Sequence, residues 1–97
     1  MDTLQFVAER AGERFEIIEG RGEGYYVLRY IDGRNTHDYL APSVSGARLT
    51  AESEWGLSPA AWRAASPGEL PLWQQQQSMA ERLSAALELP PTWKRTP

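Results

Sequence analysis

The chain has 97 residues, with 13 acidic side chains, 10 basic side chains and no cysteine, which gives a formal net charge of −3. This length predicts one domain with a modest core and little room for a deep cofactor cavity. The absence of cysteine excludes disulfide bonds, zinc–thiolate sites and cysteine nucleophiles, and the lack of a long basic run argues against a duplex-binding protein.

The first element alternates with a period of two, because Leu4, Phe6 and Ala8 share one side of an extended chain. Residues 3–9 also fit a helical stripe, so the sequence alone leaves both strand and helix open. The strand is favoured, since residues 11–13 then form a hairpin turn into a second strand.

The strongest strand signal is YYVLRYI at residues 25–31, which carries large apolar side chains on both faces. Asp32–Gly33 follows it directly and is a strong hairpin signal. Three or four antiparallel strands are therefore predicted, at about residues 3–9, 14–19, 25–31 and 35–40.

Helices are predicted to follow the strands. An amphipathic helix at residues 44–55 has Ser43 or Ser45 as its N-cap. A short helix at residues 59–65 and a longer one at about 71–89 come next.

The predicted fold is therefore α+β: a three- or four-stranded antiparallel β-meander followed by two or three helices packed on one face. Residues 1–66 form the core of this domain. Residues 67–97 form the C-terminal helix and a tail, because Pro90 and Pro91 interrupt helical structure.

The only histidine, His37, precedes Asp38 in the stretch NTHDYL, which raises the question of an acid–base pair. Neighbouring side chains on a strand point to opposite faces, so these two diverge. The glycine-rich residues 20–24 lack the spacing of a phosphate-binding loop, and the sequence contains no EF-hand loop and no H-E-x-x-H motif. We therefore predict no catalytic, cofactor or metal site, and no enzyme.

Acidic and other polar residues near the strand ends favour contact with a basic protein, since complementary charge speeds association. The predicted partner-binding residues are Glu16, Glu19, Glu23, Asp32, Arg34, His37 and Tyr39. The apolar residues of the C-terminal helix have near-heptad spacing and little to pack against, so a homodimer through this helix is also expected. The predicted self-association residues are Leu72, Trp73, Met79 and Leu83.

A nucleic-acid-binding module is the alternative, because aromatic side chains on a sheet can stack on bases. The tyrosines concerned are Tyr25, Tyr26, Tyr30 and Tyr39. Only Arg29 and Arg34 accompany them, so nucleic acid is the less favoured partner.

The stretches GYYVLRYIDG and THDYL, followed by AESEWGLSPAAWR, resemble small bacterial α+β proteins that share a hairpin, a helix and a glycine elbow beside a tryptophan. The resemblance covers about residues 24–63 and extends more loosely to the immunity proteins of bacterial toxin–immunity pairs. It implies an α+β fold and an inhibitory role, without particular functional residues.

No apolar run reaches the roughly 18–20 residues of a membrane-spanning helix, and residues 1–20 are too charged for a signal peptide. We therefore expect a cytoplasmic, non-enzymatic protein-interaction module of inhibitor or immunity type, with no cofactor and another protein as its partner.

Overall fold

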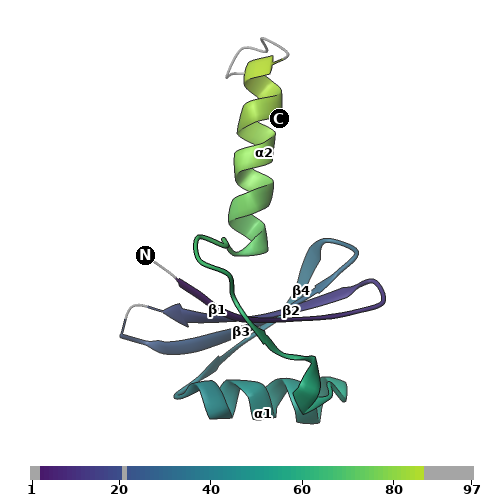
Figure 1. Ribbon diagram of the computed structural model, residues 1–97, viewed down its shortest axis with the longest axis vertical. Helices are drawn as coiled ribbons and strands as arrows, with labels where there is room; N and C mark the ends of the chain where they lie inside the picture. Colours follow the sequence, from purple (N-terminus) through teal and green to yellow (C-terminus); the bar gives the residue numbers. More distant parts are fainter. Residues whose placement is uncertain (1–2, 21, 87–97) are drawn as a thin grey trace.

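Five antiparallel strands form one sheet in the computed structural model, which describes residues 3–20 and 22–86 (Figure 1). The strands are β1 (Thr3–Arg10), β2 (Glu13–Gly20), β3 (Gly24–Ile31), β4 (Arg34–Ala41) and β5 (Arg63–Ala64). Their order in the sheet is β4-β3-β2-β1-β5, so the four long strands make a meander and β5 pairs with the outer edge of β1. The α+β class and the meander are confirmed, and the first segment is a strand.

The hairpin turn between β3 and β4 is the one that the Asp32–Gly33 pair predicts. Both residues have positive φ, at 50° and 81°, as the tight primed hairpin turn requires. The backbone N–H of Asp32 also donates to the carbonyl oxygen of Gly12 at 2.9 Å. This bond ties the β3–β4 turn to the β1–β2 turn at the same end of the sheet.

The main core lies between the sheet and α1 (Val44–Trp55), which crosses one face of the sheet (Figure 1). Ser43 is the N-cap, since its hydroxyl accepts from the Gly46 N–H at 3.0 Å, and the choice between Ser43 and Ser45 is settled. Small side chains let this helix approach the sheet closely. The buried residues of this core are Ala8, Phe15, Ile17, Val27, Ala41, Ala47, Ala51 and Leu57.

The second long helix, α2 (Leu72–Ala86), lies on the opposite side of the sheet (Figure 1). It meets the sheet with its N-terminus and points away from it. A smaller apolar cluster of Leu4, Val7 and Ile18 covers part of this second face. The prediction that the helices pack on one face is therefore corrected: α1 and α2 lie on opposite faces.

The segment between the helices also differs from the prediction. The short helix expected at residues 59–65 is only one 3-10 turn, η1 (Pro59–Ala61), after which Trp62 is extended and β5 begins. The free edge of β1 offers ladder hydrogen bonds there, and the N–H of Ala65 donates to the carbonyl oxygen of Gln5 at 2.9 Å. The chain then passes to the other face and enters α2, whose predicted end at Leu89 is outside the described residues.

Candidate functional site

The first turn of α2 is held by two buried side chains of the sheet. Glu16 on β2 is 0% exposed, and its Oε2 accepts from Arg14 Nε at 2.8 Å and from the Leu72 N–H at 2.9 Å. Tyr30 on β3 is also buried, and its hydroxyl accepts a hydrogen bond from the backbone N–H of Trp73. Free N–H groups at a helix start require such acceptors, so Glu16 and Tyr30 cap α2 from across the molecule.

Burial dominates the electrostatics of this contact. It raises the pKa of Glu16 above its usual value, although the bonds from Arg14 and Leu72 act in the opposite direction. Burial, with the nearby charge of Glu16, also raises the pKa of Tyr30 to about 12. The second carboxylate oxygen of Glu16 is buried and has no hydrogen-bond partner among residues 3–20 and 22–86. Glu16 therefore holds a helix in place and is not accessible to a partner, unlike its predicted role.

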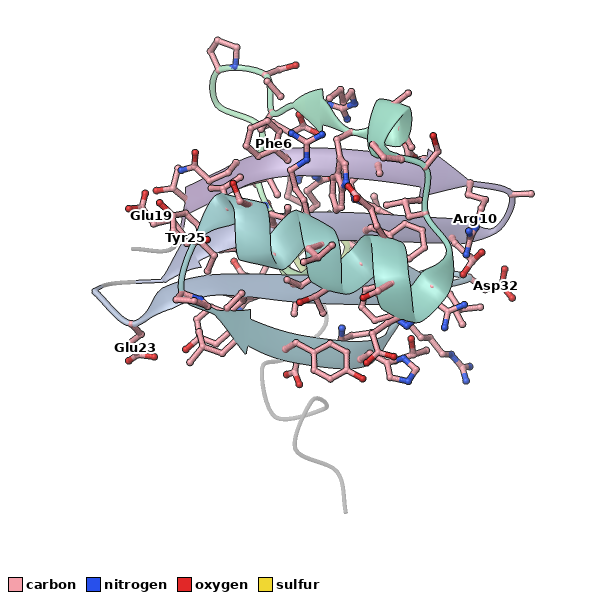
Figure 2. All side chains as sticks on the ribbon, turned by 90° about the horizontal axis from the view of Figure 1, so that it is seen from below. Phe6, Arg10, Glu19, Glu23, Tyr25 and Asp32 are labelled. Carbon is pink, nitrogen blue, oxygen red and sulfur yellow. The ribbon has the colours of Figure 1, made fainter. Side chains whose placement is uncertain are left out.

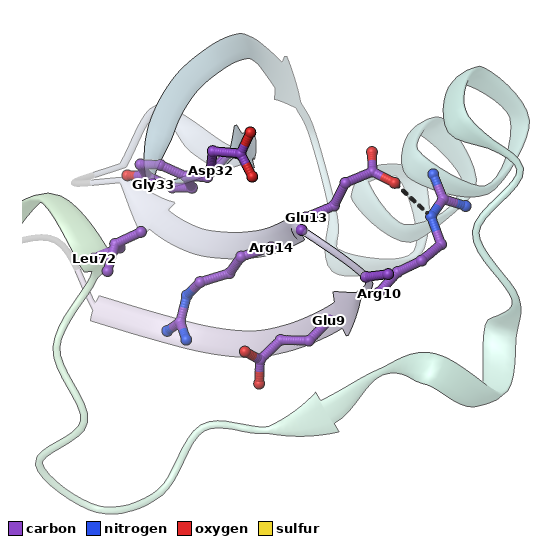
Figure 3. Close-up of a pocket in the computed structure, with 10 residues that line it drawn as sticks. Glu9, Arg10, Glu13, Arg14, Asp32, Gly33 and Leu72 are labelled. Atoms are coloured by element: carbon purple, nitrogen blue, oxygen red, sulfur yellow. Dashed lines mark hydrogen bonds and ion pairs between the residues drawn. The ribbon is translucent and has the colours of Figure 1, made fainter.

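A cleft of about 490 Å³ lies beside this contact, at the end of the sheet where the two hairpin turns meet (Figure 3). Its lining includes Glu9, Arg14, Tyr30, Asp32, Gly33 and Leu72. Three of the five charged residues that line the cleft are already paired, because Glu13 binds Arg10 and Arg14 binds Glu16. Neither Glu9 nor Asp32 makes an ion pair within the described part of the chain, although the charge of Glu9 helps to raise the pKa of Arg63, so the cleft presents two exposed carboxylates.

The predicted self-association residues gather on α2. Trp73, Met79 and Leu83 are 43%, 65% and 58% exposed, while Leu72 is half-buried at the edge of the cleft. The structure thus brings Leu72 together with the predicted partner residue Asp32. Because α2 points away from the sheet, nothing in the described chain covers the outer part of this apolar surface.

The edge strand β4 carries a second accessible surface. Every residue of β4 except Ala41 is exposed. On the α1 side, the rings of His37 and Tyr39 each lie 5.8 Å from the ring of Trp55, measured between centroids. The guanidinium of Arg29 lies over the same indole at 5.6 Å. We call Arg29, His37, Tyr39 and Trp55 the β4 ridge.

The remaining predicted partner residues do not form one surface. Figure 2 shows Glu19 and Glu23 at one end of the sheet and Asp32 at the opposite end, and Arg34 follows the turn that contains Asp32. Glu23 accepts a hydrogen bond from the hydroxyl of Tyr26, and Glu19 accepts one from Gln5. The prediction therefore separates into the β4 ridge, the cleft and a distant acidic end.

The sequence missed Glu9, Arg29 and Trp55 as members of these surfaces. The pairing of β3 with β4 places Arg29 opposite His37, and the last turn of α1 then brings Trp55 over both. The run of polar residues at 35–38 could have indicated an exposed edge strand, but no local signal places Trp55 beside it.

The tyrosines are divided between the two faces of the sheet. Tyr25 packs against the α1 core and Tyr26 against the smaller cluster, while Tyr30 is buried beneath α2. A stacking platform needs several exposed rings on one face. His37 and Asp38 likewise lie on opposite faces, as strand alternation predicts, because their β3 partners are Arg29 and Leu28.

Within residues 3–20 and 22–86, no three His, Asp or Glu side chains are grouped so that they could hold a metal ion. No helix among the described residues has both the length and the apolar character needed to cross a membrane. Comparison of the chain with family models, with curated proteins and with solved structures found no match.

Proposed function

We propose that this chain is a non-enzymatic protein-interaction module of inhibitor or immunity type, which binds another protein along β4 in the cytoplasm. The observation that carries the proposal is the exposed eight-residue edge strand backed by the β4 ridge. An edge strand leaves backbone N–H and C=O groups free, and proteins use such edges to add a strand from a partner.

The two halves of β4 differ in how accessible their backbone is. In the first half, the side-chain amide of Asn35 donates to the carbonyl oxygens of Arg29 and His37, and Thr36 donates to that of Arg29. A bulge in the pairing falls at the same place. A bulge protects an edge from pairing, and the carbonyl oxygen of His37 is already occupied by Asn35, so the free stretch is residues 38–40.

The side chains of this stretch suit a protein partner with basic groups. Tyr39 and Leu40 are exposed, and the ring of Tyr39 is braced by Trp55, which makes it a rigid anchor. Asp38 lies on the same edge strand, on the face opposite Tyr39, and it makes no ion pair in the described part of the chain. An exposed carboxylate on the edge strand favours a positively charged surface and faster association with it.

Photo-crosslinking from β4 in living cells tests the proposal. A photoreactive phenylalanine analogue replaces Tyr39, and the matched control places the same analogue at Leu49, an exposed apolar residue on α1. We expect one adduct of defined mass from position 39 and none from position 49. Equal labelling from both positions, or no adduct from position 39, contradicts binding along β4.

The crosslinked protein, once identified and purified, allows the contact to be measured directly. Tyr39→Ala and Asp38→Lys should each weaken its binding by about tenfold or more, because one removes the anchor and the other the attractive charge. Glu54→Lys on α1 is the control and should leave the affinity unchanged. Titration with labelled single-stranded DNA and RNA addresses the alternative function, and we expect no saturable binding below ~10 μM at low salt.

A further inference from the structure

Four residues form a narrow strip along α2. The strip consists of Leu72, Gln76, Met79 and Leu83, which follow one another at spacings of four, three and four. These spacings place the four side chains within a sector of about 60° around the helix axis. Leu72 lines the cleft, and the side-chain amide of Gln76 donates to the carbonyl oxygen of Gly33 at 2.7 Å. The strip therefore faces the end of the sheet that carries the hairpin turns. Its C-terminal part, from Met79 onwards, extends beyond the sheet.

The strip has the features of a helix–helix seam. The spacing of four, three and four is that of the core positions in a coiled coil, and no strip residue is charged. An isolated helix of 15 residues is marginal in water, and α2 is held by the sheet only at its first turns. A second helix on the strip would supply the packing that the outer turns lack.

Charges beside the strip define which helix fits. Arg82 is two turns after Gln75, so both lie on the same flank of the strip, and the amide of Gln75 donates to the carbonyl oxygen of Leu70 at 2.6 Å. Leu70 lines a groove together with Leu4 and Phe6 of β1, so this flank faces the β1 side of the sheet. Glu9 lies on β1 and lines the cleft below the same flank. Among the described residues, neither Arg82 nor Glu9 makes an ion pair, and Glu9 interacts with Arg63 at longer range.

We propose that a second copy of this chain covers the strip, with the two α2 helices antiparallel and Arg82 of each copy over Glu9 in the cleft of the other. Full overlap of two antiparallel strips places Leu83 of the second copy beside Leu72, at the level of the cleft. In an antiparallel pair related by a twofold axis, the same flank of each helix lies on the same side of the pair. Arg82 of the second copy therefore points towards β1 of the first copy. The twofold symmetry forms the same pair twice.

This dimer uses a different surface from β4, so the test of the dimer is independent of the test of partner binding along β4. Sedimentation equilibrium of the full chain tests it first, and we expect a dimer at ~100 μM. Met79→Asp and Leu83→Asp should each give a monomer that keeps its folded sheet and loses at most the helical circular dichroism signal of the outer turns of α2, because both side chains are exposed in one copy. A monomeric wild-type chain at this concentration overturns the proposal.

A charge exchange tests the antiparallel arrangement. Glu9→Arg and Arg82→Glu should each raise the dimer dissociation constant by roughly tenfold, since each replaces two attractive pairs with two repulsive ones. The double variant should restore the wild-type constant to within about threefold. Glu54→Arg is the matched control and should have no effect. A dimer that is insensitive to the single changes, or not restored by the double change, overturns the pairing of Arg82 with Glu9.

Discussion

Leu72 donates its backbone N–H to Oε2 of Glu16 at 2.9 Å, although 56 positions separate the two residues in sequence. Pro71 precedes the helix and is buried, and its side chain offers no acceptor for the free N–H groups of the first turn. A carboxylate below a helix start also interacts favourably with the helix dipole. The start of α2 is therefore determined by a strand from the first quarter of the chain.

Replacing Glu16 with alanine should lower the free energy of unfolding by about 2 kcal/mol. The change leaves the Leu72 N–H without its acceptor and removes the ion pair that Arg14 makes at 2.8 Å, while both donors stay partly buried. Urea denaturation followed by tryptophan fluorescence measures the difference. Glu54→Ala, on the exposed side of α1, is the control, and an equal effect of the two substitutions would show that the buried carboxylate does not hold α2.

Stability should fall as the pH drops from about 4.5 to about 2. Hydrogen bonds from Arg10, and then from Arg29, lower the pKa of Glu13 from 4.5 to about 2, and those from Arg63 and the Ser66 N–H do the same for Glu69. A carboxylate with a lowered folded-state pKa contributes stability above its unfolded value and loses it as the pH falls through the folded one. Urea midpoints measured from pH 7 to pH 2 follow this loss.

The variants Glu13→Gln and Glu69→Gln should each flatten this acid-side decline, and Glu54→Gln should not. Glu16 works in the opposite direction, because its raised folded-state pKa contributes stability below pH 4.5 that is lost as the pH rises through the folded value. Glu16→Ala should therefore make the acid-side decline steeper. If stability falls equally with pH in the wild type and in the two glutamine variants, Glu13 and Glu69 are not the source of the acid-side decline.

The meander follows from the sequence because each strand and turn is specified locally. Alternating side chains set the strands, and Asp32–Gly33 sets the turn that fixes the pairing of β3 with β4. The N-cap and the length of α1 are local as well. For this reason the strand limits and the helix at 44–55 agree with the structure to within about two residues.

The position of α2 and the identity of the exposed acids depend on distant contacts. Glu16 belongs to a series of acids that recur every three to four residues, and nothing in that series distinguishes the one buried beneath a helix. The strand β5 likewise exists only because β1 leaves an edge beside Arg63–Ala64. Sequence reasoning therefore found α2 and its apolar residues but placed it on the wrong face.

Replacing Ser43 with alanine should lower the free energy of unfolding by about 1 kcal/mol, because its hydroxyl is the acceptor for the Gly46 N–H in the first turn of α1. Ser45→Ala provides the comparison, since Ser45 is exposed within the helix and caps nothing. We expect that change to stay within about 0.5 kcal/mol of zero. Thermal and urea denaturation of both variants measure the difference, and a larger effect at position 45 would contradict the cap.

Gly24 should be the glycine least tolerant of substitution among those in the turn between β2 and β3. Its φ is +120°, and a Cβ added there would lie 2.6 Å from the carbonyl oxygen of Ala41, a backbone atom of the neighbouring strand. Gly24→Ala should therefore lower the free energy of unfolding by about 3 kcal/mol. Gly22 also has positive φ, at +67°, but a Cβ there meets nothing within 4 Å, so Gly22→Ala should cost only about 1 kcal/mol. Urea denaturation of the two alanine variants isolates the effect of close backbone approach, and equal losses would show that the φ angle alone decides both.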